Sequence, residues 1–225
     1  MTVELRDIRK SYGRKTVLRG VSFGAECGEA VGIVGANGSG KSTLLRVLAG
    51  ILKPQAGEFL WEGSDLLRSR VVLERTVGYV PQGTPLIDEL SALDNLRLWY
   101  EADALRTSLE SGMLRELGIR DFLKVPASRL SGGMRKRLSI GCALARDPQI
   151  LLLDEPTAAL DLPARERLLD YFSSFRARGG LILLATHDLR ELETCSRCFL
   201  LRGGIAEPYS YDGDAQRLAR ELEAP

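Results

Sequence analysis

Short apolar runs alternate along most of this chain with segments whose apolar residues recur at helical spacing. Three runs contain almost no polar residue and have the length of a buried strand, at residues 29–35, 149–154 and 180–186. Each precedes a stretch of helical period, at residues 41–50, 163–175 and 188–195. Strands that are apolar on both faces and alternate with helices are typical of a parallel sheet covered on both sides. The pattern therefore predicts an α/β fold.

Two other parts of the chain depart from this alternation. Residues 3–13 and 15–23 have the pattern of shorter alternating strands, which favours an antiparallel β edge subdomain. Between residues 84 and 146 only helical patterns occur. We therefore expect a single domain over residues 1–225, with a mostly parallel core from 1–83 and 147–225 and an inserted helical subdomain at 84–146.

Charge and hydropathy narrow the classes of partner. The 225 residues carry 31 Lys and Arg against 30 Asp and Glu, a formal net charge of +1, so any anion site must be local and no nucleic-acid partner is expected. The basic run Arg135, Lys136 and Arg137 is interpreted as solvated surface at a helix start. No apolar stretch is as long as a bilayer span, and the first residues lack the apolar core of a signal peptide, so we expect a cytoplasmic protein.

The four cysteines are too few and too irregularly spaced for a secreted disulfide framework in a chain of this length. Cys195 and Cys198 form one CxxC pair, but a single pair without a second pair or a histidine cannot complete a tetrahedral zinc site. We interpret them as reduced, small packing residues at a helix end and in the following strand.

The segment GANGSGKS, residues 35–42, fits the phosphate-binding pattern of a P-loop. It follows an apolar strand and opens a helix, which is the context in which this pattern binds nucleotides. Its backbone amides would wrap the phosphates, Lys41 would contact the β and γ oxygens, and the Ser42 hydroxyl would be a ligand of Mg²⁺. We therefore expect a P-loop NTPase core whose nucleotide contacts are Gly35, Ala36, Asn37, Gly38, Ser39, Gly40, Lys41, Ser42 and Thr43.

Two adjacent carboxylates end the apolar run at 149–154. Asp154 would hold the metal, and Glu155 would polarise the water that attacks the γ-phosphate. Adjacent carboxylates often belong to a solvated turn, but these end a buried strand. Ligands of open parallel sheets lie beyond the carboxyl ends of strands, which favours the functional interpretation.

Gln82 and His187 also follow apparent core strands, at VGYVP and LILLAT. Each alone carries little signal. Together with Lys41 and the carboxylate pair, however, they would lie along one rim of the sheet. There Gln82 could contact Mg²⁺ and the water, and His187 could hydrogen-bond the γ-phosphate.

A second glycine turn occurs in RLSGGMRKRL, residues 129–138. Ser131, Gly132 and Gly133 precede a helical pattern, and a Ser-Gly-Gly turn at a helix start is suited to hold an anion. The chain thus contains two candidate phosphate cradles far apart in sequence.

The order GANGSGKS, VPQ, LSGGM, LLLDEP, AALD and THD resembles the nucleotide-binding subunit of ATP-binding cassette transporters over nearly the whole chain. LSGG between the glutamine and the DE pair is the discriminating part, because many P-loop ATPases share the other motifs. The resemblance implies binding and hydrolysis of ATP, with Mg²⁺ as cofactor. It also implies that Tyr12, in KSYG, stacks on adenine.

In this family two cassettes pack head to tail, with each ATP between the P-loop of one subunit and the LSGG turn of the other. The resemblance implies that Ser131, Gly132 and Gly133 face the γ-phosphate bound by a second ABC ATPase subunit, identical or related. The turn that contains Asp161 would cross the interface beside the partner's P-loop. Because ATP joins the P-loop of one subunit to the LSGG turn of the other, ATP binding would favour the closed dimer and ATP hydrolysis would allow the dimer to open.

The resemblance further implies a membrane-spanning permease subunit as partner and a peripheral location on the cytoplasmic face of the membrane. Met134, where many members have glutamine, resembles bacterial export cassettes and favours export. The alternative is a soluble, non-transport cassette ATPase, for example of the iron-sulfur assembly type. Four apolar residues could line a groove for the membrane subunit or belong to the core: Leu86, Ile87, Leu90 and Leu93.

Overall fold

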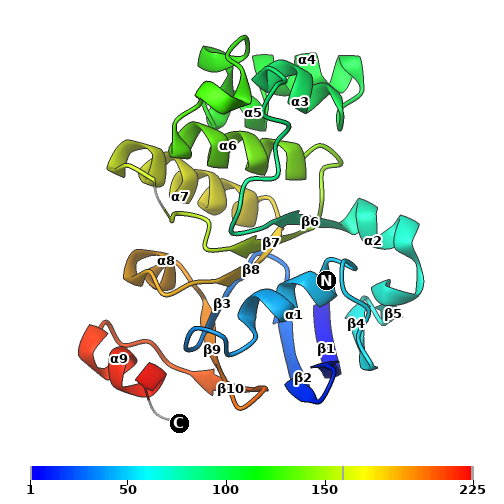
Figure 1. Ribbon diagram of the computed structural model, residues 1–225, viewed down its shortest axis with the longest axis vertical. Helices are drawn as coiled ribbons and strands as arrows, with labels where there is room; N and C mark the ends of the chain where they lie inside the picture. The colour runs from blue at the N-terminus through cyan, green and yellow to red at the C-terminus, as the bar shows by residue number, and fades with distance from the viewer. Residues whose placement is uncertain (1, 159, 224–225) are drawn as a thin grey trace.

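The computed structural model describes residues 2–158 and 160–223. Its larger sheet has six strands, in the spatial order β10 (Ile205–Tyr209), β9 (Arg197–Arg202), β3 (Ala30–Val34), β8 (Leu181–Ala185), β7 (Ile150–Asp154) and β6 (Val77–Val80) (Figure 1). The pairs from β9 to β6 are parallel, and β10 pairs antiparallel with β9 at one edge. The predicted, mostly parallel α/β sheet is confirmed.

Each face of this sheet packs against its own apolar cluster, because consecutive strand residues point to opposite faces. Ile150 of β7 packs in the cluster that contains α1 (Lys41–Leu48). The next residue, Leu151, packs in the other cluster, with α6 (Gly132–Ala143) and α7 (Leu162–Ala177). Both faces of β7 are therefore buried, which is why the strand is apolar without alternation.

The antiparallel part forms a second sheet beside α1 instead of an edge of the first (Figure 1). The predicted strand pair is present, with Tyr12 opposite Lys15 at its turn. Two strands that the sequence pattern did not indicate complete this sheet. In spatial order its strands are β2 (Lys15–Glu26), β1 (Thr2–Tyr12), β4 (Ala56–Trp61) and β5 (Ser64–Asp65).

The helices between the Gln82 and Asp154 segments form a stack on the side of the large sheet opposite α1 (Figure 1). Besides α6 they are α3 (Ala92–Arg97), α4 (Ala102–Glu110) and α5 (Met113–Glu116). The helical pattern at 91–105 is not one helix. The chain breaks after α3 and buries Tyr100, whose hydroxyl donates to the Gly141 carbonyl at 2.9 Å. The subdomain limits at residues 84 and 147 stay a prediction.

Three α-helices of the described chain lie outside these groups, and three 3₁₀ helices span Leu66–Arg68, Ile119–Phe122 and Ala127–Arg129. The α-helices are α2 (Arg70–Thr76) before β6, α8 (Leu189–Glu193) after β8, and α9 (Ala215–Glu223) near the end. Of these, α2 and α9 were not predicted from the sequence. Leu218 of α9 packs in a small cluster with Val34 of β3, Leu200 of β9 and Leu192 of α8. Helix α9 therefore covers part of the large sheet at β3 and β9.

Candidate functional site

Four neighbouring parallel strands end at one rim of the large sheet, and each is followed by a residue singled out in the sequence. The P-loop follows β3, His187 follows β8, and Gln82 follows β6. Asp154 is the last residue of β7, and Glu155 follows it. Because all four strands run in the same direction, their carboxyl ends meet at this rim. The structure thus brings together residues that lie far apart along the chain.

Glu155 lies at the centre of this group. Its Oε2 accepts a hydrogen bond from Gln82 Nε2 at 2.8 Å, and its Oε1 lies 3.4 Å from Nδ1 of His187. The backbone of Glu155 has φ 48°, in the left-handed region that residues with a side chain seldom adopt. This conformation lies directly after β7, where the carboxylate faces both partners.

Asp154 and Ser42 form the second contact of the rim. Ser42 Oγ donates to Oδ1 of Asp154 at 3.1 Å, and Asp154 is 2% exposed. Oδ2 of Asp154 is buried and has no hydrogen-bond partner among the residues that the structure describes. Burial raises the pKa of Asp154. A buried carboxylate oxygen without a donor, beside a serine hydroxyl, fits the oxygen ligands that Mg²⁺ prefers.

Lys41 is the first residue of α1 and is buried. Its Nζ donates to the carbonyls of Gly35 at 2.6 Å and Ala36 at 3.1 Å, so the ammonium closes the P-loop on itself. Burial lowers the pKa of Lys41, while the nearby Glu155 and Asp154 raise it. The Lys41 side chain is therefore held inside the P-loop, where the negative charge of both carboxylates favours its protonated form.

The rest of the P-loop is shaped by close backbone packing. Gly40 precedes α1 with φ 112° and no side-chain cap, which leaves the first amides of the helix for a ligand. A Cβ on Gly35 would lie 2.6 Å from the Leu201 carbonyl and from Ser39 Oγ, so only glycine fits there. Ala36, Asn37 and Gly38 are exposed at the tip of the loop, and Ser42 and Thr43 are half-buried in the first turn of α1.

The second glycine turn lies on a different element. Ser131 caps α6 by accepting a hydrogen bond from the Met134 amide at 3.3 Å, and Ser131 and Gly132 are exposed. The P-loop precedes α1 and the Ser131 turn precedes α6, and these two helices pack on opposite faces of the sheet (Figure 1). The two glycine turns of one protomer therefore lie on different parts of its surface.

Tyr12 and Asp161 are also at the surface. Tyr12 ends β1, and Lys10 Nζ lies 5.5 Å from its ring centroid. Asp161 caps α7 by accepting from the Ala164 amide at 2.9 Å. Ala159, in the same AALD turn, lies outside the described residues.

The interpretation of the basic run as solvated surface is wrong, because Lys136 is buried and Arg135 and Arg137 are half-buried. Lys136 is 3% exposed, and its Nζ donates to the carbonyls of Pro81 at 2.9 Å, Gln82 at 3.4 Å and Asp154 at 3.4 Å. Burial lowers its pKa to about 8. Sequence reasoning missed this link between α6 and the rim because three successive basic residues resemble an exposed helix start.

The structure divides the four apolar residues after Gln82. Leu86 and Leu93 pack against the buried cluster around α6, Leu90 is half-buried, and Ile87 is 46% exposed. Two of them therefore pack against the core. Ile87 is the exposed member of the four.

The cysteines lie where the sequence pattern placed them. Cys195 follows α8 and Cys198 lies in β9, and both are free thiols. In the described ranges 2–158 and 160–223, no group of three His, Cys, Asp or Glu side chains could hold a metal ion. Within those ranges there is also no helix long and apolar enough to cross a bilayer.

Comparison with known proteins agrees with this arrangement. The family model for ABC transporters matches residues 18–158. Nod factor export ATP-binding protein I of Rhizobium etli is 35% identical over 217 residues, covering 93% of this chain and 69% of that protein. Lantibiotic transport ATP-binding protein SrtF of Streptococcus pyogenes is 31% identical over 213 residues, covering 94% and 92%.

A solved structure has the same fold and a bound product. It is a dimeric ATP-binding cassette in a post-hydrolysis state with ADP and Pi, at a TM-score of 0.79 and 29% identity, covering 91% of this chain and 96% of that one. The P-loop, the rim residues and these similarities lead to one conclusion: this chain belongs to the ABC transporter family, in which it is an ATP-binding and ATP-hydrolysing subunit.

Proposed function

We propose that this chain drives export of a solute through a separate membrane-spanning permease, by binding and hydrolysing MgATP between two cassettes. The observation that carries the proposal is the position of Glu155, whose carboxylate faces Gln82 at 2.8 Å and His187 at 3.4 Å beside the buried Asp154. A carboxylate between two polar groups, next to a cation site, is arranged to orient and activate water.

The P-loop holds the triphosphate. Its glycines let the backbone amides approach the phosphate oxygens, and the first amides of α1 point in the same direction. Lys41 exchanges its contacts with the Gly35 and Ala36 carbonyls for the β and γ oxygens. Tyr12, exposed at the end of β1, stacks on the adenine.

Ser42, Asp154 and Gln82 are the residues that would hold Mg²⁺. The 3.1 Å contact between Ser42 and Asp154, together with the buried Oδ2 of Asp154 that lacks a partner within the described chain, supports this set. Gln82 uses its amide nitrogen for Glu155, so its amide oxygen is the atom suited to a cation. Held by these residues, Mg²⁺ would supply positive charge to offset the charge that develops on the triphosphate.

Glu155 accepts the proton of the attacking water as the new bond to the γ-phosphorus forms, the bond from that phosphorus to the bridging oxygen breaks, and ADP leaves. Gln82 orients the water from one side of the carboxylate. His187 contacts the γ-phosphate from the other side, which suits its exposed position at the end of β8. In this scheme Glu155 activates the water, Gln82 orients it, and His187 contacts the γ-phosphate that is transferred to it.

The second cradle completes the site of another cassette. Ser131, Gly132 and Gly133 begin α6 on a surface separate from their own P-loop, so the γ-phosphate that they contact belongs to a partner. Asp161, exposed at the start of α7, lies beside the partner's P-loop. The head-to-tail dimer closes when ATP is bound, and it opens after the ATP is hydrolysed.

The direction of transport and the membrane partner are inferred from the relatives. The proteins from Rhizobium etli and Streptococcus pyogenes are named for export and for lantibiotic transport. Met134 in the LSGGM segment supports the same direction. We therefore place this chain on the cytoplasmic face of a membrane, against a permease with several spans.

Glu155→Gln tests the site. We expect this variant to bind MgATP, to hydrolyse it at least about a hundredfold more slowly, and to accumulate as a dimer in size-exclusion chromatography with MgATP. The matched control is Glu166→Gln on the exposed face of α7, which removes the negative charge from a 3.0 Å contact with Arg190 and leaves the rim untouched. Normal turnover by Glu155→Gln would remove this residue from its role.

Purification of the tagged chain from native membranes in mild detergent tests the transport part. A stoichiometric partner with several membrane spans supports the proposal, and its sequence identifies the cargo class. Recovery of active ATPase with a soluble partner alone would favour the non-transport alternative.

A further inference from the structure

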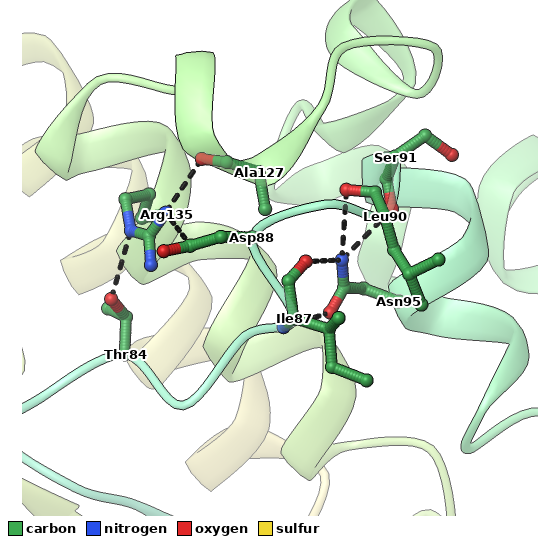
Figure 2. Close-up of polar contacts among 8 residues, drawn as sticks. All are labelled: Thr84, Ile87, Asp88, Leu90, Ser91, Asn95, Ala127 and Arg135. Carbon is green, nitrogen blue, oxygen red and sulfur yellow. Dashed lines mark hydrogen bonds and ion pairs between the residues drawn. The ribbon is translucent and has the colours of Figure 1, made fainter.

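Residues 83–91 connect Gln82 to α3 without forming a helix or an extended strand, and we call them the 83–91 loop. The loop makes short local backbone bonds, from the Leu86 amide to the Thr84 carbonyl at 2.8 Å and from the Leu90 amide to the Ile87 carbonyl at 3.2 Å. Two polar side chains from outside the loop, Asn95 and Arg135, hold it on opposite sides (Figure 2).

Asn95 holds the second half of the loop. It lies in α3 and is 2% exposed. Its Oδ1 accepts from the Ile87 amide at 2.9 Å, and its Nδ2 donates to the carbonyls of Ile87, Leu90 and Ser91 at 3.1, 3.3 and 3.0 Å (Figure 2). Asn95 therefore joins the loop to the helix that directly follows it in the chain.

Arg135 holds the first half of the loop from a different element. Its Nε donates to Thr84 Oγ1 at 3.2 Å, and its Nη1 donates to Asp88 Oδ1 and to the Ala127 carbonyl, both at 2.7 Å (Figure 2). The guanidinium is largely buried, with 22% of the side chain exposed. A planar guanidinium meets three acceptors at fixed angles, so it sets geometry as well as charge.

Arg135 is also tied to the second glycine turn. Its backbone amide donates to the Ser131 carbonyl at 2.9 Å in the first turn of α6. The next residue, Lys136, holds the carbonyls of Pro81 and Gln82. Two successive residues of α6 thus hold the chain on both sides of Gln82, Lys136 through Pro81 and Arg135 through Thr84.

We propose that Arg135 is a positioning residue for ATP hydrolysis, which fixes the 83–91 loop to α6 so that Gln82 stays against Glu155 when the Ser131 end of α6 meets a partner's nucleotide. This inference rests on the proposed roles of Glu155 and of the Ser131 turn. Arg135 itself acts through the loop: its contacts are Thr84, Asp88 and Ala127.

The test is the steady-state ATPase of the full chain with Arg135→Met, which keeps length and apolar volume but removes all three donors. We expect kcat to fall about tenfold, as when the supporting contacts of a functional group are lost. KM for ATP should stay within about twofold, because the P-loop that binds ATP is untouched. A smaller folded fraction would also lower the apparent kcat at constant KM, so kcat is expressed per ATP-binding site, with the sites counted by equilibrium binding of ATP to each variant.

Two further variants keep the test independent of folding. Arg135→Lys retains the charge but cannot meet three acceptors at once, so its kcat should lie between those of the wild type and Arg135→Met. Asp88→Asn, added to Arg135→Met, should cause no additional loss, because Asp88 acts through Arg135. The matched control is Arg106→Met, which breaks an exposed 2.9 Å pair with Asp103 within α4, outside the loop.

Wild-type kcat in a folded Arg135→Met chain overturns the inference, and so does an equal loss of kcat in Arg106→Met. Failure here is distinct from failure of the proposed function. If Glu155→Gln is inactive while Arg135→Met is fully active, only the positioning role is wrong. If Glu155→Gln retains normal turnover, both are wrong.

Discussion

The backbone amide of Thr157 donates to Oε1 of Glu191 at 2.9 Å, and both residues are buried. Thr157 follows Glu155 by two residues, and Glu191 lies in α8, which follows His187. This hydrogen bond therefore joins the two segments that carry Glu155 and His187. A bond between buried groups holds the separation of the segments more firmly than an exposed one would.

Glu191 should make stability depend on pH. Burial raises its pKa above the ordinary value of 4.5, so the folded chain binds this proton more tightly than the unfolded chain does. The resulting stabilisation is complete below the unfolded pKa and is lost as pH rises through the folded one. Glu191→Gln keeps the acceptor for Thr157 but does not titrate.

We therefore expect the free energy of unfolding of the wild type to decline, relative to that of Glu191→Gln, as pH rises above about 4.5. Urea unfolding of both proteins over a pH series measures this difference. Parallel curves for the two proteins would show that the carboxyl has the same pKa in both states.

Ser42→Ala should impair use of Mg²⁺ more than binding of the nucleotide itself. The change removes the hydroxyl 3.1 Å from Asp154 and leaves the backbone amides of the P-loop in place. We expect the Mg²⁺ concentration for half-maximal ATPase to rise about tenfold, with metal-free ATP affinity unchanged in calorimetry. Ser173→Ala, on the exposed face of α7, is the control, and an unchanged Mg²⁺ requirement in Ser42→Ala would contradict the assignment.

Gly133→Ala should stabilise the protomer and weaken the dimer. A Cβ at this position would lie 3.5 Å from Leu160 and 3.6 Å from Ala164, which are ordinary contacts. Alanine in place of glycine favours the helix by up to about 1 kcal/mol. We expect thermal unfolding at an equal or higher temperature, together with less MgATP-driven dimer in the Glu155→Gln background, and dimerisation at the parent level would count against a close approach at this turn.

Gly141→Ala in the same helix should have the opposite effect on stability. Its Cβ would lie 2.7 Å from Ile119 and 2.7 Å from Leu114, in the core of the helical stack. Overpacking of this kind typically costs about 1–3 kcal/mol, more than the gain in helix propensity. Chemical denaturation measures the change, and a stability equal to that of the wild type would mean that the core has room for the methyl group.

The sequence predicted the chemistry better than the connections between its parts. The P-loop and the Asp154 and Glu155 pair could be located because each depends on a few consecutive residues at a strand end. Lys136 was misinterpreted because it is buried only when α6 packs against the ends of β6 and β7. A run of three basic residues does not reveal this packing. The break between α3 and α4 was missed for the same reason, since it depends on Tyr100 reaching Gly141.

What the sequence by itself determined is the set of local units: apolar strands, the helices between them, and the glycine turns at 35–42 and 131–133. These depend on backbone conformation and on patterns within a few residues. Only the tertiary structure decided which units are neighbours. Gln82 and Glu155 are 73 residues apart, and they meet at 2.8 Å because long-range packing places β6 beside β7. Strand order depends on contacts distributed over the whole core, and no short segment encodes it.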